Sequence, residues 1–573
     1  MSYRSLLDCI NDLEKNNQIL KIKQEVDPDL DMASIHIDEF QNRSNVIFFE
    51  KVKGSKYAAV SNIFGTNQRT RFIFRSSIDH VKSLIDLKSN PRLFLKKPFS
   101  SFFSLLYGIY SLPKKVKFPS SFKEIQIEDL PQIRCWEKDG GSFITLPQVY
   151  TEDIENPGIK NSNLGMYRIQ LCGNDYKLNK EVGMHYQLHR GIGIHQKKAH
   201  DQGKPLRVSI FIGGPPSHTL SAIMPLPEKM SELEFAGILG KRRFRYAKKD
   251  GYTISVDADF VICGKIYPGE LKPEGPFGDH LGYYSLKHDF PVLRVEKVFA
   301  KENGIWPFTV VGRPPQEDSQ FGSLIHELTG NAIKSEIPGL HSINAVDDAG
   351  VHPLLLAIGS ERYTPYNSIK KPQELLTIAN HILGTGQLSL CKYLFICDNK
   401  SLDINDEESF FTYFLSIVDW NRDLHFQTKT TMDTLDYSGD RLNEGSKVVI
   451  AAAGKIKRIL VDALESIVLP KDFSNQNFIS KGNLVLQGRG DINDLISCLE
   501  QQDLEGVSLI TLVDDADFVS QNFSNWLWVT FTRSNPANDI YGLHSETKEK
   551  HFSCSIPLID ARIKEHHAPI LER

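Results

Sequence analysis

The stretch LRVSIFIGGPP (residues 206–216) joins a short β-like run to a turn of two glycines and two prolines. Further short runs of the same kind occur on both sides of it, separated by turn residues: 143–146, 167–171, 260–266, 292–299 and 308–311. Short strands at such regular spacing are typical of an antiparallel barrel or sandwich. We therefore predict a β-rich domain from about residue 125 to residue 313.

One helix interrupts the strand pattern. Ser231 and Glu234 have the spacing of a capping box, and apolar residues at helical spacing accompany them: Leu233, Phe235, Ile238 and Leu239. The basic run 241–245 comes next. We interpret this run as the solvated end of the helix rather than as a nucleic-acid site.

Helix and strand patterns mix on either side of the β-rich part. Near the N-terminus, one helical face precedes β-like runs at 19–26, 46–49 and 57–60, which indicates a small α/β domain; the face consists of Leu6, Leu7, Ile10 and Leu13. Beyond residue 334, strand-like runs alternate with helical ones, which favours a layered α/β domain with a largely parallel sheet; the strand-like runs are 393–397, 448–452, 484–486 and 508–513, and the helical runs are 408–418 and 492–501. We therefore predict three domains, at 1–120, 121–333 and 334–573.

Composition places the chain among ordinary globular proteins. Its 573 residues are 40% hydrophobic and 24% charged, with a net charge of -4, which argues against a protein that coats nucleic acid or membranes. The apolar stretch 94–112 is broken by Lys96, Lys97 and Pro98, so we expect no membrane span. The N-terminus does not resemble a secretory signal. The eight cysteines form no C-x-x-C pair, so we expect reduced cysteines and a cytoplasmic location.

Two acids stand in the loop EGPFGDH (residues 274–280). Pro276 fixes its own φ and the glycines permit positive φ, so the loop can hold Glu274 and Asp279 near one point. Paired carboxylates push their pKa values apart, which lets one act as an acid while the other stays ionised. From spacing alone, a turn with two solvated acids is the commoner alternative.

The segment NLGMYR (residues 163–168) leads into another β-like run. Arg168 at the start of a strand can clamp a carboxylate through two parallel hydrogen bonds, although a surface ion pair is the commoner fate of an arginine. Asn163, His189 and Glu232 offer an amide oxygen, an imidazole and a carboxylate, which suit a divalent metal such as Mn²⁺. Simpler alternatives stay open, because Glu232 in a first helical turn is favoured by the helix dipole and His189 fits equally well as a buried, hydrogen-bonded histidine.

Glycine-rich phosphate loops are missing from the sequence. It has no G-x-G-x-x-G after a strand and no G-x-x-x-x-G-K-[ST]. We therefore expect neither a Rossmann dinucleotide site nor a P-loop.

Taken together, these segments resemble the UbiD family of prenylated-flavin-dependent decarboxylases, which includes the ferulic acid decarboxylases. The resemblance covers nearly the whole chain, and the combination of segment 163–168 with loop 274–280 is specific. The matching motifs are 163–168, 188–191, 213–216, 224–227 with Ser231 and Glu232, 274–280, 312–315, 531–536 and 559–562.

The resemblance implies an α/β multi-domain fold. A small N-terminal α/β domain precedes a central split β-barrel domain of the flavin-binding type, which binds prenylated FMN. A C-terminal α/β domain mediates oligomerisation, so we expect a homo-oligomer, a dimer or a hexamer.

The resemblance also implies the cofactors. Prenylated FMN, supplied by a separate flavin prenyltransferase, is bound with its phosphate held through a divalent metal, usually Mn²⁺, and a monovalent cation such as K⁺ nearby. The metal ligands match Asn163, His189 and Glu232. The expected cofactor-binding set is Asn163, Arg168, His189, Met224, Glu232 and a lysine, either Lys370 or Lys371.

In the family an arginine lies between two acids, matching Arg168, Glu274 and Asp279. Arg168 is expected to orient the leaving carboxylate and to balance its charge. Glu274 holds Arg168 in place, and Asp279 delivers the proton that replaces CO₂. The reverse reaction, carboxylation at high CO₂, follows from microscopic reversibility.

The second acid bears on the substrate. Ferulic acid decarboxylases have Glu at this position, whereas family members of ubiquinone synthesis read Gly-Asp-His and then Gly-Tyr-Tyr, as residues 278–280 and 282–284 do here. The resemblance therefore favours a hydroxylated aromatic acid: a polyprenylated 4-hydroxybenzoate, or else a naphthoate of the menaquinone pathway. Two other classes stay open, an FMN-binding oxidoreductase on the same barrel and a non-catalytic cofactor-binding subunit.

Overall fold

The computed structural model describes residues 2–89, 106–186, 191–224, 226, 231–367, 369–439, 441–464 and 467–571. They divide into two compact units, Met1–Ala332 with Ile570–Arg573, and Ile333–Pro569. The predicted three-domain boundaries stay a prediction, because this division separates only two units. Much of the apolar stretch 94–112 lies outside the described residues. Within the described part of the chain, no helix is both long and apolar enough to cross a membrane.

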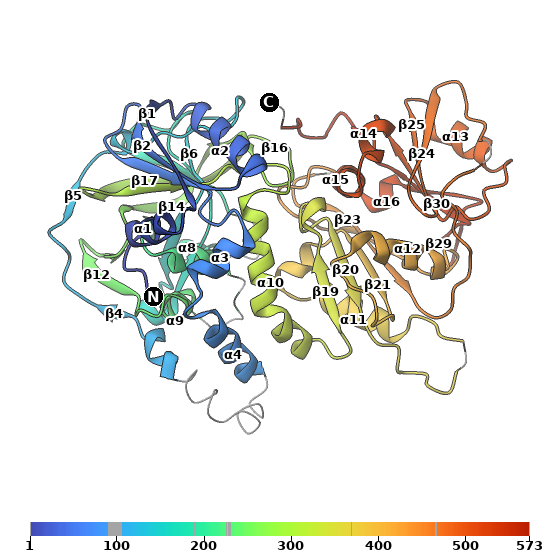
Figure 1. Cartoon of the computed structure of the whole chain (residues 1–573), viewed down its shortest axis with the longest axis horizontal. Helices are drawn as coiled ribbons and strands as arrows, with labels where there is room; N and C mark the ends of the chain where they lie inside the picture. Colours follow the sequence, from blue (N-terminus) through green and yellow to red (C-terminus); the bar gives the residue numbers. More distant parts are fainter. Residues whose placement is uncertain are drawn as a thin grey trace. The chain divides into compact units, whose positions relative to one another are not determined.

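The N-terminal part of the first unit forms a four-stranded sheet with helices beside it (Figure 1). Helix α1 (Leu6–Lys15) starts where the Ser5 hydroxyl accepts a hydrogen bond from the backbone N–H of Asp8. The helix was predicted, but Leu7 does not belong to its buried face, since it is 45% exposed. The other helices are α2 (Asp31–Asn42), α3 (Asn67–Ile73) and α4 (Ile78–Ser89), and the strands are β1 (Ile19–Val26), β2 (Val46–Val52), β3 (Ala58–Ser61) and β18 (Ile305–Phe308).

Strand β18 corrects one prediction. The run 308–311 was expected as a strand of the central β-rich domain, but the strand ends at Phe308 and pairs in parallel with β3 of the N-terminal sheet. This pairing buries Trp306 and Phe308, which are 0% and 1% exposed. The burial of these two large rings explains why the strand joins this sheet.

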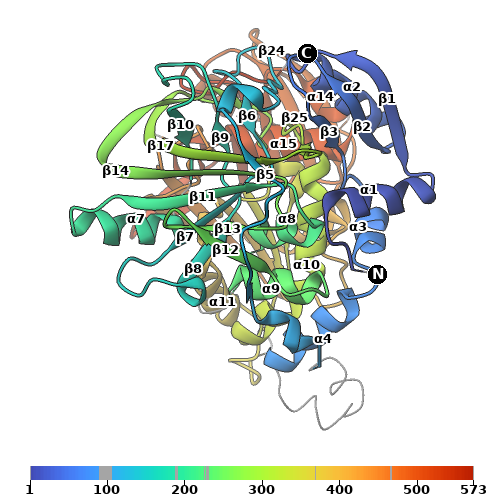
Figure 2. The same ribbon diagram turned by 90° about the vertical axis from the view of Figure 1, so that its left-hand side faces the viewer.

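The central part forms a nine-stranded antiparallel sheet, whose long strands β11, β14 and β17 lie side by side in Figure 2. The strand order runs from β6 at one edge to β8 at the other. Among the described residues, no hydrogen bonds between these two edge strands close the sheet into a barrel. The β-rich domain is therefore confirmed in its coarse form, as a partial barrel. Its strands are β5 (Phe122–Glu124), β6 (Phe143–Ile144), β7 (Gln148–Glu152), β8 (Ser162–Gly165), β9 (Ile169–Gln170), β10 (Glu181–Met184), β11 (Leu206–Ile212), β14 (Phe260–Glu274) and β17 (His288–Lys301).

The predicted helix in this part is present as α9 (Glu232–Leu239), and the Ser231 hydroxyl accepts from the N–H of Leu233. The interpretation of the basic run as its solvated end is wrong. The run leads into β12 (Arg245–Lys249), and Arg242 and Arg245 pair with the buried carboxylate of Asp257. A buried carboxylate needs such partners. The remaining elements are α7 (Gly191–Asp201), α8 (Pro216–Ile223), β4 (Lys114–Lys115), β13 (Tyr252–Ser255), β15 (Phe277–Gly278) and β16 (Tyr284–Ser285).

Helix α10 (Glu317–Glu336) has no counterpart among the predicted elements. Its first residue, Glu317, is fully buried and accepts hydrogen bonds from the backbone N–H groups of Asn62 and Phe64 at 3.1 and 2.8 Å. The start of the helix is therefore fixed by a contact with a distant earlier segment of the chain, which local sequence patterns do not reveal.

The second unit contains two five-stranded sheets (Figure 1). The prediction of one largely parallel sheet is wrong in this respect, because each sheet has parallel pairings in its centre and an antiparallel strand at either edge. The first sheet consists of β19 (Ser342–Ala345), β20 (Leu354–Ile358), β21 (Tyr393–Cys397), β23 (Glu444–Ala452) and β22 (Leu424–Thr431); the second consists of β24 (Phe473–Ser480), β25 (Asn483–Gly488), β26 (Leu509–Val513), β30 (Ile556–Asp560) and β27 (Ile540–Leu543).

Helices cover both faces of the first sheet. Leu394 and Ile396 pack in one cluster with apolar residues of α11 (Glu374–Leu383), whereas the ring of Phe395 meets Phe411 and Phe414 of α12 (Glu407–Ile417) edge-on. Since side chains alternate along a strand, the two helices lie on opposite faces. The further elements of this unit are α13 (Ile492–Leu499), α14 (Ala516–Ser520), α15 (Phe523–Arg533), α16 (Pro536–Asp539), β28 (Glu546–Lys548) and β29 (His551–Ser553).

The ring of Phe260 joins the N-terminal and central sheets of the first unit, since it meets Tyr57 and Trp306 edge-on at 4.8 and 5.2 Å between centroids. We expect Phe260→Ala to lower the free energy of unfolding of this unit by about 3–5 kcal/mol, because it leaves a cavity in a buried cluster. Denaturant unfolding followed by tryptophan fluorescence measures the change. Leu271→Ala, on the exposed part of the same strand, serves as the control; a loss below about 1 kcal/mol for Phe260→Ala would contradict the expectation.

Candidate active site

Arg168 lies at the centre of a buried cluster of charged side chains in the first unit. It directly precedes β9, and its side chain is 8% exposed. Its Nε and Nη2 donate to the two carboxylate oxygens of Glu274 at 2.9 and 2.8 Å. Glu274 is the last residue of β14 and is fully buried. The ion pair is therefore bidentate, which fixes the plane of the Arg168 guanidinium relative to the plane of the Glu274 carboxylate.

The second acid lies on the other side of the same guanidinium group. Arg168 Nη1 donates to Asp279 Oδ2, and Asp279, which follows β15, is 6% exposed. The structure thus brings together the three residues predicted as catalytic, which come from two separate segments. It excludes the alternative of a turn with two solvated acids, because both carboxylates are buried against one cation.

Three more side chains contact Arg168, and none of them was expected from the sequence. Arg168 Nη2 also donates to the Ser285 hydroxyl at 2.8 Å, and the guanidinium lies 4.6 Å from the centroid of the Phe277 ring. His185 Nδ1 lies 3.1 Å from Arg168 Nη2 and 3.2 Å from Glu274 Oε2. Phe277 and Ser285 lie within or close to the acidic loop, but His185 has no local motif that would have indicated it.

The number of hydrogens on Arg168 Nη2 determines which tautomer His185 adopts. Arg168 Nη2 has two hydrogens, and its shorter contacts to Glu274 Oε2 and Ser285 Oγ use both. His185 Nδ1 must therefore carry its own hydrogen and donate it to Glu274. Burial, and then the charge of Arg168, lower the pKa of His185, so the ring is neutral at pH 7.

Both acids are ionised in the resting site. Burial alone would raise the pKa of Glu274, but Arg168 and His185 outweigh it and hold the pKa at about 2. For Asp279, burial again opposes ionisation, while the His280 ring and Arg168 bring its pKa below the ordinary value. The cluster therefore holds two anions and one permanent cation, which leaves Arg168 more than neutralised.

A second segment fixes the backbone of the acidic loop. The N–H of Gly278 donates to Asp139 Oδ1 at 2.7 Å, and the N–H of Gly140 donates to Pro276 O at 2.8 Å. Position 278 requires glycine, because a Cβ there would lie 2.1 Å from the Trp136 ring. Asp139 is itself buried, which raises its pKa to about 7 even though it accepts three backbone N–H groups. The loop backbone next to Asp279 is thus held in one conformation.

Two of the three predicted metal ligands lie close to each other. Asn163 is in β8, and the N–H of the next residue, Leu164, donates to Glu232 Oε2 at 3.3 Å. His189 lies outside the described residues. Gly191, two positions later, approaches Asn163 so closely that a Cβ on it would be 2.1 Å from Asn163 Oδ1. Among the described residues, no group of three or more His, Cys, Asp or Glu is arranged to hold a metal.

The donor set nevertheless fits a hard divalent cation. The Glu232 carboxylate is largely buried and accepts hydrogen bonds from backbone N–H groups, and burial raises its pKa to about 7. An amide oxygen and a carboxylate are ligands that Mn²⁺ or Mg²⁺ accepts. A cation beside Asn163 and Glu232 would supply the charge that balances the buried carboxylate.

The other residues expected at the cofactor belong to both units. Met224 is 5% exposed and packs in the apolar cluster of Phe235 and Leu239. Lys370 and Lys371 belong to the second unit, where both are exposed and Lys370 Nζ lies 3.7 Å from Asp398 Oδ2. That one of these two lysines binds the cofactor stays a prediction.

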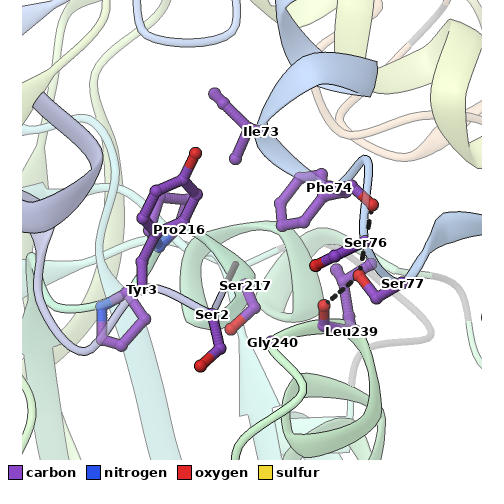
Figure 3. Close-up of a pocket in the computed structure, with 11 residues that line it drawn as sticks. Ser2, Tyr3, Ile73, Phe74, Ser76, Ser77, Pro216, Ser217, Leu239 and Gly240 are labelled. Carbon is purple, nitrogen blue, oxygen red and sulfur yellow. Dashed lines mark hydrogen bonds between the residues drawn. The ribbon is translucent and has the colours of Figure 1, made fainter. Parts of the chain in front are cut away.

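A separate pocket of the first unit does not belong to the charged cluster (Figure 3). It lies between the N-terminal residues, the turn after α3, and helices α8 and α9. Ser77 at its edge donates to Leu239 O at 2.6 Å. Apolar side chains and hydroxyl groups line it, and it offers no cation for an acid substrate: Ser2, Tyr3, Ile73, Phe74, Ser76, Ser77, Pro215, Pro216, Ser217, Leu239 and Gly240.

We expect Glu274→Gln to destabilise the first unit by about 3–5 kcal/mol at pH 7, because it removes the main anion from a buried ion pair. The folded pKa of Glu274, about 2, lies below its ordinary value of 4.5. The contribution of ionised Glu274 to the free energy of unfolding is therefore complete above pH 4.5 and is lost as the pH falls toward 2. The difference in unfolding free energy between variant and wild type shrinks in that range. Urea unfolding at about pH 7, 5, 4 and 3 measures it, with Glu270→Gln, in the exposed pair with Arg294, as control. A difference that does not depend on pH would refute this account.

Comparison with known proteins gives the chain a family. It matches three family models that describe the 3-octaprenyl-4-hydroxybenzoate carboxy-lyase UbiD: its N-terminal domain at residues 10–88, its Rift-related domain at 112–314 and its C-terminal domain at 319–452. A protein of Chlamydia pneumoniae, named as one of the subunits of a 4-hydroxybenzoate decarboxylase, is 35% identical over 570 residues, 97% of this chain and 93% of that protein.

Solved structures share the fold. The vanillic acid decarboxylase of Sedimentibacter hydroxybenzoicus, in its closed form, is similar with a TM-score of 0.68 at 23% identity, over 82% of this chain and 97% of that one. An evolved dimeric form of the UbiD-class enzyme HmfF from Pelotomaculum thermopropionicum, in complex with prFMN, gives a TM-score of 0.58 at 18% identity, over 81% and 99%. The family models together span more than half of the chain, and the chain therefore belongs to the UbiD family of decarboxylases and is a carboxy-lyase.

Proposed function

We propose that this protein catalyses the non-oxidative, reversible decarboxylation of an aromatic or α,β-unsaturated carboxylic acid with prenylated FMN as cofactor. The observation that supports it most is the guanidinium of Arg168 held between the buried carboxylates of Glu274 and Asp279. A fixed cation of this kind binds and orients a carboxylate substrate. A neighbouring acid can deliver the proton that replaces CO₂.

The cofactor is proposed from the family and from the donor set at Asn163 and Glu232. When bound, prenylated FMN supplies the electron sink that decarboxylation at an sp² carbon requires. Asn163 and Glu232, together with His189, would hold the divalent metal that carries the cofactor phosphate, and we expect this metal to be Mn²⁺; a K⁺ ion is proposed beside it. A flavin prenyltransferase would supply the cofactor.

The three central residues have different tasks in this proposal. Glu274 is locked by two hydrogen bonds to Arg168 and a third from His185, so it keeps the guanidinium in place rather than moving protons. Asp279 accepts a single hydrogen bond through Oδ2 from Arg168, so it can exchange this contact for a substrate. Because both acids are almost inaccessible to water, charges within the cluster interact strongly.

For the substrate, we propose a hydroxylated aromatic acid. The named relatives act, by their names, on 4-hydroxybenzoate and vanillic acid. Asp279 is also the shorter acid, which the family members of ubiquinone synthesis have where ferulic acid decarboxylases have Glu. A polyprenylated 4-hydroxybenzoate is the first candidate and a naphthoate of menaquinone synthesis the second. We propose that the protein works as a homo-oligomer.

The test is co-expression with a flavin prenyltransferase, followed by mass spectrometry of the bound cofactor and metal analysis. We expect prenylated FMN, about one divalent metal per chain, and CO₂ release from at least one acid in a panel of hydroxybenzoates, naphthoates and cinnamates. Glu232→Gln serves as a comparison that loses metal and retains less cofactor. Unmodified FMN, together with NAD(P)H oxidation and no CO₂ release, would instead support an oxidoreductase.

We expect Asp279→Asn to lower kcat by at least about 100-fold, since asparagine has a similar shape but cannot deliver the proton. Cofactor content and the chromatographic profile should stay as in the wild type. Asp201→Asn, at an exposed pair on α7, is the control. A variant with more than a tenth of the wild-type kcat would show that another group supplies the proton.

A further inference from the structure

Asp279 is deprotonated in the resting site, so the proton that replaces CO₂ must first reach it from another group. Its pKa lies below the ordinary value and it faces Arg168, so at pH 7 it is a carboxylate without a proton to give. Each turnover of a decarboxylase consumes one proton at the carbon that loses CO₂. A group that connects Asp279 to the solvent must therefore reload it.

Substrate binding makes this reloading favourable. An acid substrate brings a third anion to a cluster that already has two carboxylates and one guanidinium. A further negative charge raises the pKa of nearby carboxyl groups. Glu274 is fixed by its two bonds to Arg168, so the proton goes to Asp279, which has one.

His280 has the geometry to supply this proton. Its Nδ1 lies 2.8 Å from Asp279 Oδ1, and its backbone N–H donates to the same oxygen at 2.8 Å. Because an ionised carboxylate only accepts hydrogen bonds, Nδ1 must carry the hydrogen. The His280 side chain is 23% exposed, whereas the side chains of Asp279 and Arg168 are 9% and 8% exposed. Of these three side chains, His280 is therefore the one that solvent reaches best.

The other side chains of the cluster do not fit this task. Arg168 remains protonated at any pH of interest and cannot act as an acid. His185 donates its Nδ1 hydrogen to Glu274 and is buried. Among the described contacts of Asp279, His280 is thus the titratable group that both touches the carboxylate and is partly exposed.

We propose that His280 is the proton relay that recharges Asp279 between turnovers, a role that rests on the proposed decarboxylation. Water protonates Nε2, and the Nδ1 proton passes to Asp279 Oδ1, which leaves His280 neutral in its other tautomer. Asp279 then delivers its proton to the substrate carbon as the bond to CO₂ is lost. The ring then returns to its resting tautomer by releasing the Nε2 proton to solvent and taking up a proton at Nδ1. The net transfer is one proton from solvent to product per turnover, with no change of oxidation state in the relay.

The decisive variant is His280→Asn. The asparagine amide places a donor near the position of Nδ1, so Asp279 keeps its orientation, but the amide cannot take up and pass on a proton at pH 7. We expect kcat to fall about 10- to 100-fold, while KM and the bound cofactor stay within about twofold of the wild type. The solvent deuterium isotope effect on kcat should increase, and added imidazole should restore part of the rate. His544→Asn, on an exposed histidine of the second unit, is the matched control.

The outcomes separate the relay from the parent proposal. A wild type without CO₂ release across the acid panel counts against the proposed function. An active wild type with a His280→Asn variant at more than half its kcat overturns the relay alone. A variant that loses activity together with cofactor or substrate affinity, without rescue by imidazole, shows only a structural role and overturns the relay as well.

Discussion

The bidentate ion pair of Arg168 with Glu274 connects the start of β9 to the end of β14, two segments that lie far apart in the sequence. The other groups of the site are arranged around this guanidinium. Asp279 contacts Nη1 on the opposite side, and Ser285 and His185 contact Nη2. A buried ion pair of this kind contributes little net stability compared with apolar packing, because both charges lose their hydration. What the pair provides is a fixed orientation of the guanidinium in a dry site, where charges interact more strongly than in water.

The surrounding fold limits where the two acids can move. Glu274 is held by strand pairing up to its own residue, since it pairs with His288 of β17. Asp279 lies beyond the strand, on a loop whose backbone is bound by Asp139 and Gly140. The C-terminal residues return to the same loop, because the N–H of Leu571 donates to Gly282 O at 3.0 Å. The backbones of both acids are therefore held in place, and the two carboxylates differ in their hydrogen bonding, which matches a division between a residue that positions and a residue that exchanges protons.

Parts of the fold followed from local pattern. The run 206–212 corresponds residue for residue to β11, and Ser231 caps the helix that was predicted after it. In the second unit, the run 393–397 is β21. Elements whose ends are fixed by distant contacts were not predictable in this way. Helix α10 begins where Glu317 binds the backbone of Asn62 and Phe64, and β18 joins the N-terminal sheet because two aromatic rings are buried there.

The sequence by itself determined that two acids share one short loop in which glycines permit positive φ, but from spacing alone a turn with two solvated acids stayed the commoner alternative. The resemblance then selected Arg168 as their partner. Only the tertiary structure decided that the three charged side chains meet, that His185 contacts Glu274, and that the His280 ring contacts Asp279. The physical reason is that local sequence specifies backbone propensity over a few residues, whereas a buried ion pair depends on strand register across the whole sheet. The pairing of Asn163 with Glu232 belongs to the same class, because β8 and α9 come together only in the folded chain.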